Sequence, residues 1–247
     1  MSIQLLSAAA RPDLRPAAEA LTAALYPPYM QHDTVSNWAW EALYDPQLAD
    51  YQTIAVDEAG VVVALGNAIP FLWEDGTELP DEGWDAVLGG GVSDMRAGRK
   101  ANALSALSIV VAHSQRGSDL ADRMLGAMKE AARAKGLGAL VAPVRPTRKA
   151  QYQLQSFAQY CGWRLPDGAP FDPWVRKHWR LGARIVKVAP RSMVIPGTLA
   201  QWQEWTGLRF PQSGEYAFDG GLAPLSVDVE RDQAVYVEPN LWMQHQL

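Results

Sequence analysis

The sequence predicts a mixed α/β fold (α+β by some schemes), with a central mixed sheet flanked by helices and an added C-terminal β-rich segment. Two observations predict it. A strand–helix–strand unit lies in the middle of the chain, and short apolar runs alternate with helical patterns before it. Further β-branched runs separated by turn residues follow, and these indicate the additional strands.

The central unit spans residues 104–144. Residues 104–111 form an apolar run with β-branched residues at its end, which is typical of a buried strand. A loop over 113–118 leads into a helix from about Asp119, with apolar side chains at three- and four-residue spacing on one face. Gly136 ends this helix, and residues 139–144 form the next strand. The intervening helix makes the two strands parallel through a right-handed crossover.

The first hundred residues predict a short strand over 3–6, helices over 11–25 and 36–43, and a hairpin over 51–72. The segment 74–100 is rich in glycine and acidic residues and is longer than a hairpin connection requires. Two interpretations stay open for it, a lid over the active site and a surface loop. Its charges Asp81, Glu82 and Asp85 are expected to be solvated.

After the central unit we expect a helix over 151–160 and strands over 175–182 and 183–188. A helix beginning near Thr198 and strands over 225–229 and 234–237 complete the chain. No repeat and no clear linker interrupt it. We therefore divide the chain into residues 1–184 and a β extension, 185–247, packed on the same domain.

Composition limits the function. The 247 residues are 48% hydrophobic, ample for a core, and the net charge of −5 argues against nucleic acid as a partner. No apolar run reaches about eighteen residues, so we expect no membrane span. The N-terminal residues lack the basic region of a signal peptide, and the single cysteine, Cys161, is expected to be a buried thiol. Together these features predict a cytoplasmic protein.

The turn between strand 104–111 and the following helix could bind an anion. The first N–H groups of a helix have no partner within it, and they lie at its positive end. Gly117 would let a ligand approach the backbone, Arg116 brings a positive charge, and Ser118 could cap the helix or bond the anion. An ordinary strand-to-helix turn with a serine cap fits the same residues, so the spacing leaves both interpretations open.

Residues 111–121 resemble the acetyl-CoA signature of the GCN5-related N-acetyltransferases, Arg/Gln-x-x-Gly-x-Gly/Ala. Arg116, Gly117 and the small residue Ala121 match, whereas Asp119 stands where the family usually has a second glycine. The order of elements around the motif is also the family's order. Residues 171–182 resemble a subgroup of acetyltransferase-like proteins from actinobacteria.

This resemblance implies the acyl-CoA N-acyltransferase fold and an enzyme that transfers acetyl from acetyl-CoA to a small-molecule amine by direct attack, without a metal. It also implies that the two parallel strands splay apart and that the pantetheine arm enters the gap. The residues implied in cofactor binding are Ile109, Val110, Val111, Arg116, Gly117, Ser118, Asp119, Leu120 and Ala121. Arg148, in a basic loop at the end of the fifth strand, is a candidate for a CoA phosphate, with a solvated loop as the alternative.

Two residues are candidates for catalysis. The family's usual tyrosine, which protonates the leaving thiolate, is replaced at its expected position by Ala158, and Tyr160 is the nearby substitute. His113 could act as a base, although an exposed loop histidine is the alternative. His178 could orient the tryptophan-rich region or be structural. No Ser-His-Asp or metal-ligand spacing is present.

The ten tryptophans admit two interpretations, an apolar acceptor pocket or a second small core for the extra strands, and we prefer the second. Four aromatic residues of the N-terminal helices are candidates for the acceptor wall or for core filling: Tyr26, Tyr29, Trp38 and Trp40. Two other functions stay open: a non-catalytic CoA or acyl-CoA-binding protein on the same fold, and an assembly module using its Trp-rich tail. A homodimer is also an open arrangement.

Overall fold

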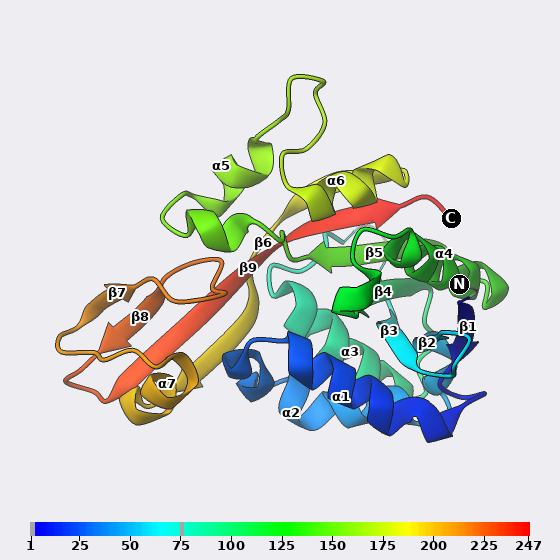
Figure 1. The fold of residues 1–247 in the computed structure, drawn as a ribbon, viewed down its shortest axis with the longest axis horizontal. Coiled ribbons are helices and arrows are strands. Elements are labelled where there is room, and N and C mark those ends of the chain that lie inside the picture. Colours follow the sequence, from blue (N-terminus) through cyan, green and yellow to red (C-terminus); the bar gives the residue numbers. More distant parts are fainter. Residues whose placement is uncertain (1–2, 75–76) are drawn as a thin grey trace.

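A single twisted sheet runs through the computed structural model, which describes residues 3–74 and 77–247 (Figure 1). Within these ranges the sheet has nine strands in the order β1-β2-β3-β4-β5-β9-β8-β7, and β6 also pairs with β9. The strands are β1 Gln4–Ser7, β2 Thr53–Val56, β3 Val62–Phe71, β4 Ala103–Val111, β5 Ala139–Val144, β6 Ala183–Gly197, β7 Gly214–Tyr216, β8 Leu225–Asp228 and β9 Gln233–His245.

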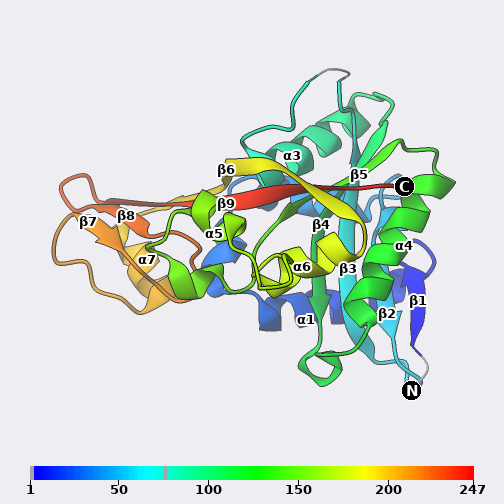
Figure 2. The ribbon, with the colours of Figure 1, turned by 90° about the horizontal axis from the view of Figure 1, so that it is seen from above.

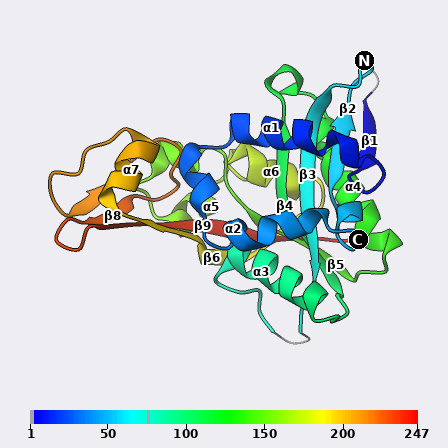
Figure 3. The ribbon, with the colours of Figure 1, turned by 90° about the horizontal axis from the view of Figure 1, so that it is seen from below.

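Helices cover both faces of this sheet. One face carries α1 (Arg15–Leu25), α2 (Ser36–Ala39) and α3 (Gly83–Arg96), which Figure 3 shows in front of the strands. The opposite face carries α4 (Leu120–Ala134), α5 (Phe157–Gly162) and α6 (Pro173–Arg180), and α5 and α6 lie above β9 in Figure 1. No helix in the described ranges is long and apolar enough to cross a membrane.

The parallel strands β4 and β5 pair only at their beginnings. Their register covers Ala103↔Ala139 to Ser105↔Val141, and the strands then diverge while β5 continues in an antiparallel ladder with β9. A β-bulge at Leu107 interrupts the pairing of β4 with β3, because Asn67 faces Ser108 while Ala68 faces Ala106. The splay implied by the resemblance is therefore confirmed, and it opens a gap in the middle of the sheet.

The central strand–helix–strand unit and the hairpin β2–β3 have the predicted positions. Strand β5 covers 139–144 as expected, and α4 buries Leu120, Met124, Leu125 and Met128 along one face. These elements were predictable because each one buries a regular apolar face against the sheet.

Two predicted elements after β5 are wrong. Residues 175–182 are not a strand, because most of them belong to α6. Asp172 begins this helix: its carboxylate accepts hydrogen bonds from the Trp174 and Val175 amides, and Pro173 occupies the first turn. The helix expected over 151–160 instead begins at Phe157, where Ser156 caps it.

The surface-loop interpretation of segment 74–100 is wrong, and residues 75 and 76 lie outside the described ranges. The segment contains α3, whose buried side chains Trp84, Val87, Leu88 and Val92 pack in the largest apolar cluster. Its Gly91 lies against β3, where an added Cβ would meet Ile69 at 2.7 Å and the Pro70 carbonyl oxygen at 2.8 Å. The segment is therefore part of the core.

The C-terminal segment 185–247 contributes to the same sheet, since β9 pairs with both β5 and β6. Beyond the central sheet, β6 and β9 continue as a long arm that carries β7, β8 and α7 (Leu199–Thr206), as Figure 2 shows. The arm has its own core around Trp202, Phe218 and Tyr236. Trp202 is fully buried there, which confirms for this residue the second-core interpretation of the tryptophans.

Candidate functional site

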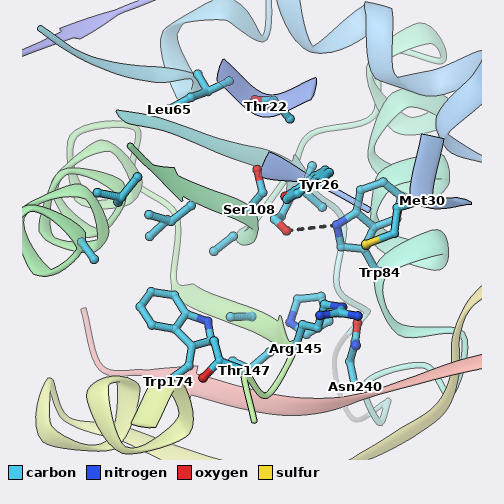
Figure 4. Close-up of a pocket in the computed structure, with 18 of the residues that line it drawn as sticks. Thr22, Tyr26, Met30, Leu65, Trp84, Ser108, Arg145, Thr147, Trp174 and Asn240 are labelled. Atoms are coloured by element: carbon cyan, nitrogen blue, oxygen red, sulfur yellow. Dashed lines mark hydrogen bonds between the residues drawn. The ribbon is translucent and has the colours of Figure 1, made fainter. Parts of the chain in front are cut away.

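A cavity of about 1250 Å³ passes through the sheet where β4 and β5 diverge (Figure 4). On the face of α4 and α6 it is lined by residues that include Arg116, Gly117, Ser118, Ala121, Arg148, Trp174, Lys177 and His178. On the face of α1 and α3 the lining includes Glu19, Thr22, Tyr26, Met30, Trp40, Glu41, Tyr44, Trp84 and Met193. Two molecules could therefore enter from opposite faces and meet beside β4.

The loop before α4 supplies part of the anion site that its sequence predicts. The amides of Arg116 and Ser118 are already bonded to loop carbonyls, and the Ser118 hydroxyl accepts from the Leu120 amide at 3.2 Å, whereas Asp119 is the N-cap residue of α4. The amides of Gly117 and Ala121 have no acceptor in the described part of the chain. Gly117 has a φ of +84°, a conformation that favours glycine.

The structure brings most of the predicted cofactor residues to the cavity. Those that line it are Ile109, Val111, Arg116, Gly117, Ser118, Ala121 and Arg148. Val110 does not, because alternate side chains of a strand point to opposite faces. Leu120, the first residue of α4, is fully buried. Asp119 precedes it and is exposed, and its side chain makes no capping hydrogen bond.

Tyr160 does not reach the cavity lining. It is 1% exposed and packs against Tyr152, Trp163 and Phe171, and its phenol donates a 2.7 Å hydrogen bond to Asp172. Burial and this carboxylate raise the pKa of Tyr160. This tyrosine therefore supports the wall of the cavity through Asp172.

Asp172 is a residue that sequence reasoning missed as an organiser of the site. One of its oxygens caps α6, and the carboxylate also accepts bonds from the Thr147 and Arg148 amides, at 3.2 and 2.8 Å. It thus fixes α6 relative to the loop that carries Arg148. The Asp172-Pro173 pair is a helix-start signal that could have revealed α6.

Neither His113 nor Cys161 belongs to the cavity lining. His113 is exposed in a single turn that precedes the Gly117 loop. Cys161 is buried, as expected, and burial raises the pKa of its thiol to about 12, which keeps it protonated.

The wall nearest β4 on the α1 and α3 face is aromatic. Figure 4 shows Tyr26 and Trp84 beside Ser108, across the cavity from Trp174. The Trp84 indole donates a 3.0 Å hydrogen bond to the carbonyl of the bulged residue Leu107, which ties α3 to β4. Burial raises the pKa of Tyr26, and the Ser108 hydroxyl partly offsets this effect.

Of the four aromatic residues considered for the acceptor wall, Tyr26 and Trp40 line the cavity. Tyr29 instead fills the core of the arm, and Trp38 is 46% exposed.

Part of the cavity wall is an ion pair between Arg145 and the buried carboxylate of Glu238. The Arg145 Nε lies 2.9 and 3.1 Å from the two carboxylate oxygens of Glu238, whose side chain is 1% exposed. Arg145 also donates to Tyr29 and to the Gly220 carbonyl of the arm. Composition predicts only a basic loop here, because nothing in the sequence reveals that β9 brings Glu238 beside it.

Near Glu238, Asp33 and Asp85 form a carboxyl pair. Asp33 Oδ1 accepts from the Ser36 amide at 2.7 Å, and Asp85 Oδ2 accepts from the Val194 amide at 3.1 Å. The remaining oxygens, Asp33 Oδ2 and Asp85 Oδ1, are buried without a hydrogen-bond partner among the described residues. Burial raises the pKa of both carboxyls. The expectation that Asp85 is a solvated charge is therefore wrong, and burial raises its pKa to about 8.

Comparison with known proteins agrees with this architecture. No protein-family model matches the chain. Arginine N-acetyltransferase avaD of Aspergillus versicolor is 34% identical over 270 residues, which cover 98% of this chain and 93% of that protein.

Solved structures share the fold at low identity. The loading GNATL domain of CurA from Lyngbya majuscula has a TM-score of 0.61 and 15% identity, with 100% and 98% of the two chains covered. The GphF GNAT-like decarboxylase in complex with isobutyryl-CoA has a TM-score of 0.51 and 17% identity, with 100% and 99% covered. On its extensive similarity to the avaD protein, and with the fold and the splayed strands in agreement, the chain belongs to the GCN5-related N-acetyltransferase superfamily.

Proposed function

We propose that the protein transfers acetyl from acetyl-CoA to the amine of a small molecule, with arginine as the first candidate acceptor. The observation that carries this proposal is the cavity that joins both faces of the sheet at the divergence of β4 and β5. A donor on one face and an acceptor on the other would react in the gap between these strands.

The donor is assigned to the face of α4 and α6. Its pyrophosphate would lie at the beginning of α4, where the Gly117 and Ala121 amides are available and Arg116 adds positive charge. Arg148 also lines this side and would pair with phosphate oxygens. The thioester arm would then follow the main chain of Ile109 and Val111 into the gap.

The acceptor is assigned to the face of α1 and α3. Glu19 and Glu41 line this side and give it carboxylates that attract a cationic substrate. The guanidinium of Arg15 already lies between them, 2.6 Å from Glu19 and 2.5 Å from Glu41, and over the ring of Tyr44 at 4.1 Å. Two carboxylates and one guanidinium leave a net negative charge on this side, and the name of the avaD relative makes a cationic acceptor the first candidate.

Catalysis would depend mainly on holding the two reactants together. Alignment of an amine with a thioester can contribute about 7–11 kcal/mol in favourable cases. The bulge at Leu107 and the departure of β5 free the β4 main chain near Ser108 from part of its pairing. We assign to this main chain the stabilisation of the developing oxyanion.

The test is release of free CoA thiol from acetyl-CoA in the presence of arginine, with mass spectrometry to locate the acetyl group on the product. Citrulline is the matched acceptor, because it replaces the guanidinium with a neutral group of similar size. We expect turnover with arginine and at least tenfold lower kcat/KM with citrulline.

Three outcomes would contradict the proposal in different ways. Absence of acetyl-CoA binding at millimolar concentration would reject the donor. Binding without turnover on arginine or on a panel of other amines would favour a non-catalytic acyl-CoA-binding protein. Equal activity with arginine and citrulline would retain the transferase and reject the cationic acceptor.

A further inference from the structure

A pair of buried histidines lies beside the cavity on the face assigned to the donor. The Nδ1 atom of His178, on α6, is 2.9 Å from Nε2 of His245, near the end of β9. Both side chains are 2% exposed. Burial lowers the pKa of His178 to about 3 and that of His245 to about 4, so both rings are neutral near pH 7 and a single proton bridges them.

One nitrogen of this pair is available to a ligand. His178 lines the cavity, and its Nε2 has no hydrogen-bond partner in the ranges that the structure describes. The Nε2 atom of His178 is accessible from the cavity, whereas the Nδ1 atom of His245 is fully buried. When His178 donates the bridging proton from Nδ1 to Nε2 of His245, Nε2 of His178 is the free acceptor of its neutral ring.

The position of α6 indicates what that nitrogen meets. Trp174 and His178 are one helical turn apart on α6 and pack edge to face, with ring centroids 4.7 Å apart. Lys177 forms an ion pair with Asp122 on α4, so the two helices are held beside each other on one face of the sheet. A ligand that runs from the beginning of α4 into the gap between β4 and β5 must pass this wall.

The pantetheine arm of acetyl-CoA carries groups that can donate a hydrogen bond to this nitrogen. A pantetheine arm carries two amide N–H groups, and an N–H that enters a largely apolar cavity needs a partner. The neighbouring parts of the wall, Ile109, Ala121 and Ala142, offer no polar side chain. His178 does.

We propose that His178 is a positioning residue for the acyl-CoA donor, that its Nε2 accepts a hydrogen bond from an amide N–H of the pantetheine arm, and that His245 orients its ring. This inference rests on the proposed function, because it requires the donor to lie on the face of α4 and α6. It adds the residue that aligns the thioester arm along the gap.

Two variants separate contact with the donor from support of the ring. An asparagine amide overlaps Nδ1 of histidine, and a glutamine amide reaches the position of Nε2. His178→Asn should therefore keep the hydrogen bond to His245 and lose the hydrogen bond from the pantetheine arm. His178→Gln should keep the hydrogen bond from the pantetheine arm. Arg180→Gln, on the exposed side of the same helix, is the control.

Calorimetry with acetyl-CoA and with ADP, which lacks the arm, reads out the difference. We expect His178→Asn to weaken acetyl-CoA binding about tenfold and to leave ADP binding unchanged, with His178→Gln within about threefold of wild type. Unchanged acetyl-CoA binding by His178→Asn would overturn the proposal. An equal loss of ADP binding would also overturn it, because the effect would then be structural.

A measurement on the unaltered protein covers the case in which the variants fail to fold. The chain has four histidines, so selective 15N labelling of histidine resolves four rings. Acetyl-CoA should shift the Nε2 signal of His178, and ADP should not. No shift with acetyl-CoA bound would contradict the inference, whereas bound donor without turnover would contradict only the transferase function.

Discussion

At the scale of single residues, buried polar groups around the cavity are paired across long sequence separations. Arg145 and the buried carboxylate of Glu238 are 93 residues apart and form an ion pair beside the arm. Asp33 and Asp85 are two carboxyls whose pKa values are raised by burial, and His178 and His245 are joined by a hydrogen bond. Each pair joins two elements, so the state of one side chain affects the packing of both.

The Asp33–Asp85 pair makes stability depend on pH. The folded pKa of Asp85, about 8, lies above its ordinary value of 3.8, so between these pH values the native state holds a proton that the unfolded chain releases. The contribution of this proton to the free energy of unfolding is fully present below about pH 4. It is lost as pH rises toward 8, with a slope of up to about 1.4 kcal/mol per pH unit.

Asp85→Asn should remove this loss, because an amide stays neutral at every pH. Urea denaturation between pH 5 and 9 should show the variant more stable than wild type at pH 8 and less dependent on pH. Asp81→Asn, on the exposed part of the same segment, should keep the wild-type slope. Parallel pH profiles for wild type and Asp85→Asn would mean that Asp85 does not hold this proton in the native state.

At the scale of elements, α3 depends on close contact with β3. Gly90 and Gly91 are neighbours on this helix with opposite surroundings: a Cβ at Gly91 would meet backbone 2.8 Å away, and one at Gly90 would meet nothing within 4 Å. Gly91→Ala should therefore lower the free energy of unfolding by about 1–3 kcal/mol through overpacking. Gly90→Ala should raise it by about 0.5–1 kcal/mol, because alanine favours helix. Similar values for both variants in urea denaturation would refute the close packing.

The loop before α4 can be tested with glycines at both ends of that helix. Gly117 and Gly136 have positive φ values, +84° and +69°, and both have open space around the Cβ position. Valine at either position strains the backbone by about 1–2 kcal/mol. Only Gly117→Val should also displace the amides assigned to the pyrophosphate, so it should weaken acetyl-CoA binding at least tenfold. Calorimetry that found equal binding by both variants would remove the anion site from this loop.

At the scale of the whole molecule, Tyr29 links the cavity region to the arm. Its ring packs against Trp202, Phe218 and Tyr236, and its phenol donates to the Gly220 carbonyl at 3.0 Å. The adjacent residue Met30 lines the cavity. Displacement of the arm should therefore change the acceptor side of the site.

Tyr29→Ala should lower the free energy of unfolding by about 3–5 kcal/mol and raise the KM for the amine more than the KM for acetyl-CoA. Phe210→Ala is the matched control, since this buried ring packs on Tyr216 within the arm and does not line the cavity. It should reduce stability with both KM values unchanged. If the two variants alter the KM values alike, the arm does not shape the acceptor side.

The elements whose side chains repeat with a regular period can be predicted from the sequence alone. The strand–helix–strand unit from β4 to β5, the hairpin β2–β3 and the loop of Arg116 to Ala121 could all be predicted, because periodicity and glycine positions are local properties. The same local signals missed α6, where the Asp172 cap outweighed the β-branched and aromatic residues of the segment.

Which side chains face the cavity depends on the tertiary fold and could not be read from the sequence. Tyr160 was a reasonable candidate from its position in the chain, yet the fold directs it to Asp172, while Trp84 arrives from a segment expected to be a loop. The pairs Asp33–Asp85 and His178–His245 have no local signature, because strand pairing and helix docking bring their members together over 52 and 67 residues. Burial then sets their protonation, since the neutral form is the one that a low-dielectric interior stabilises.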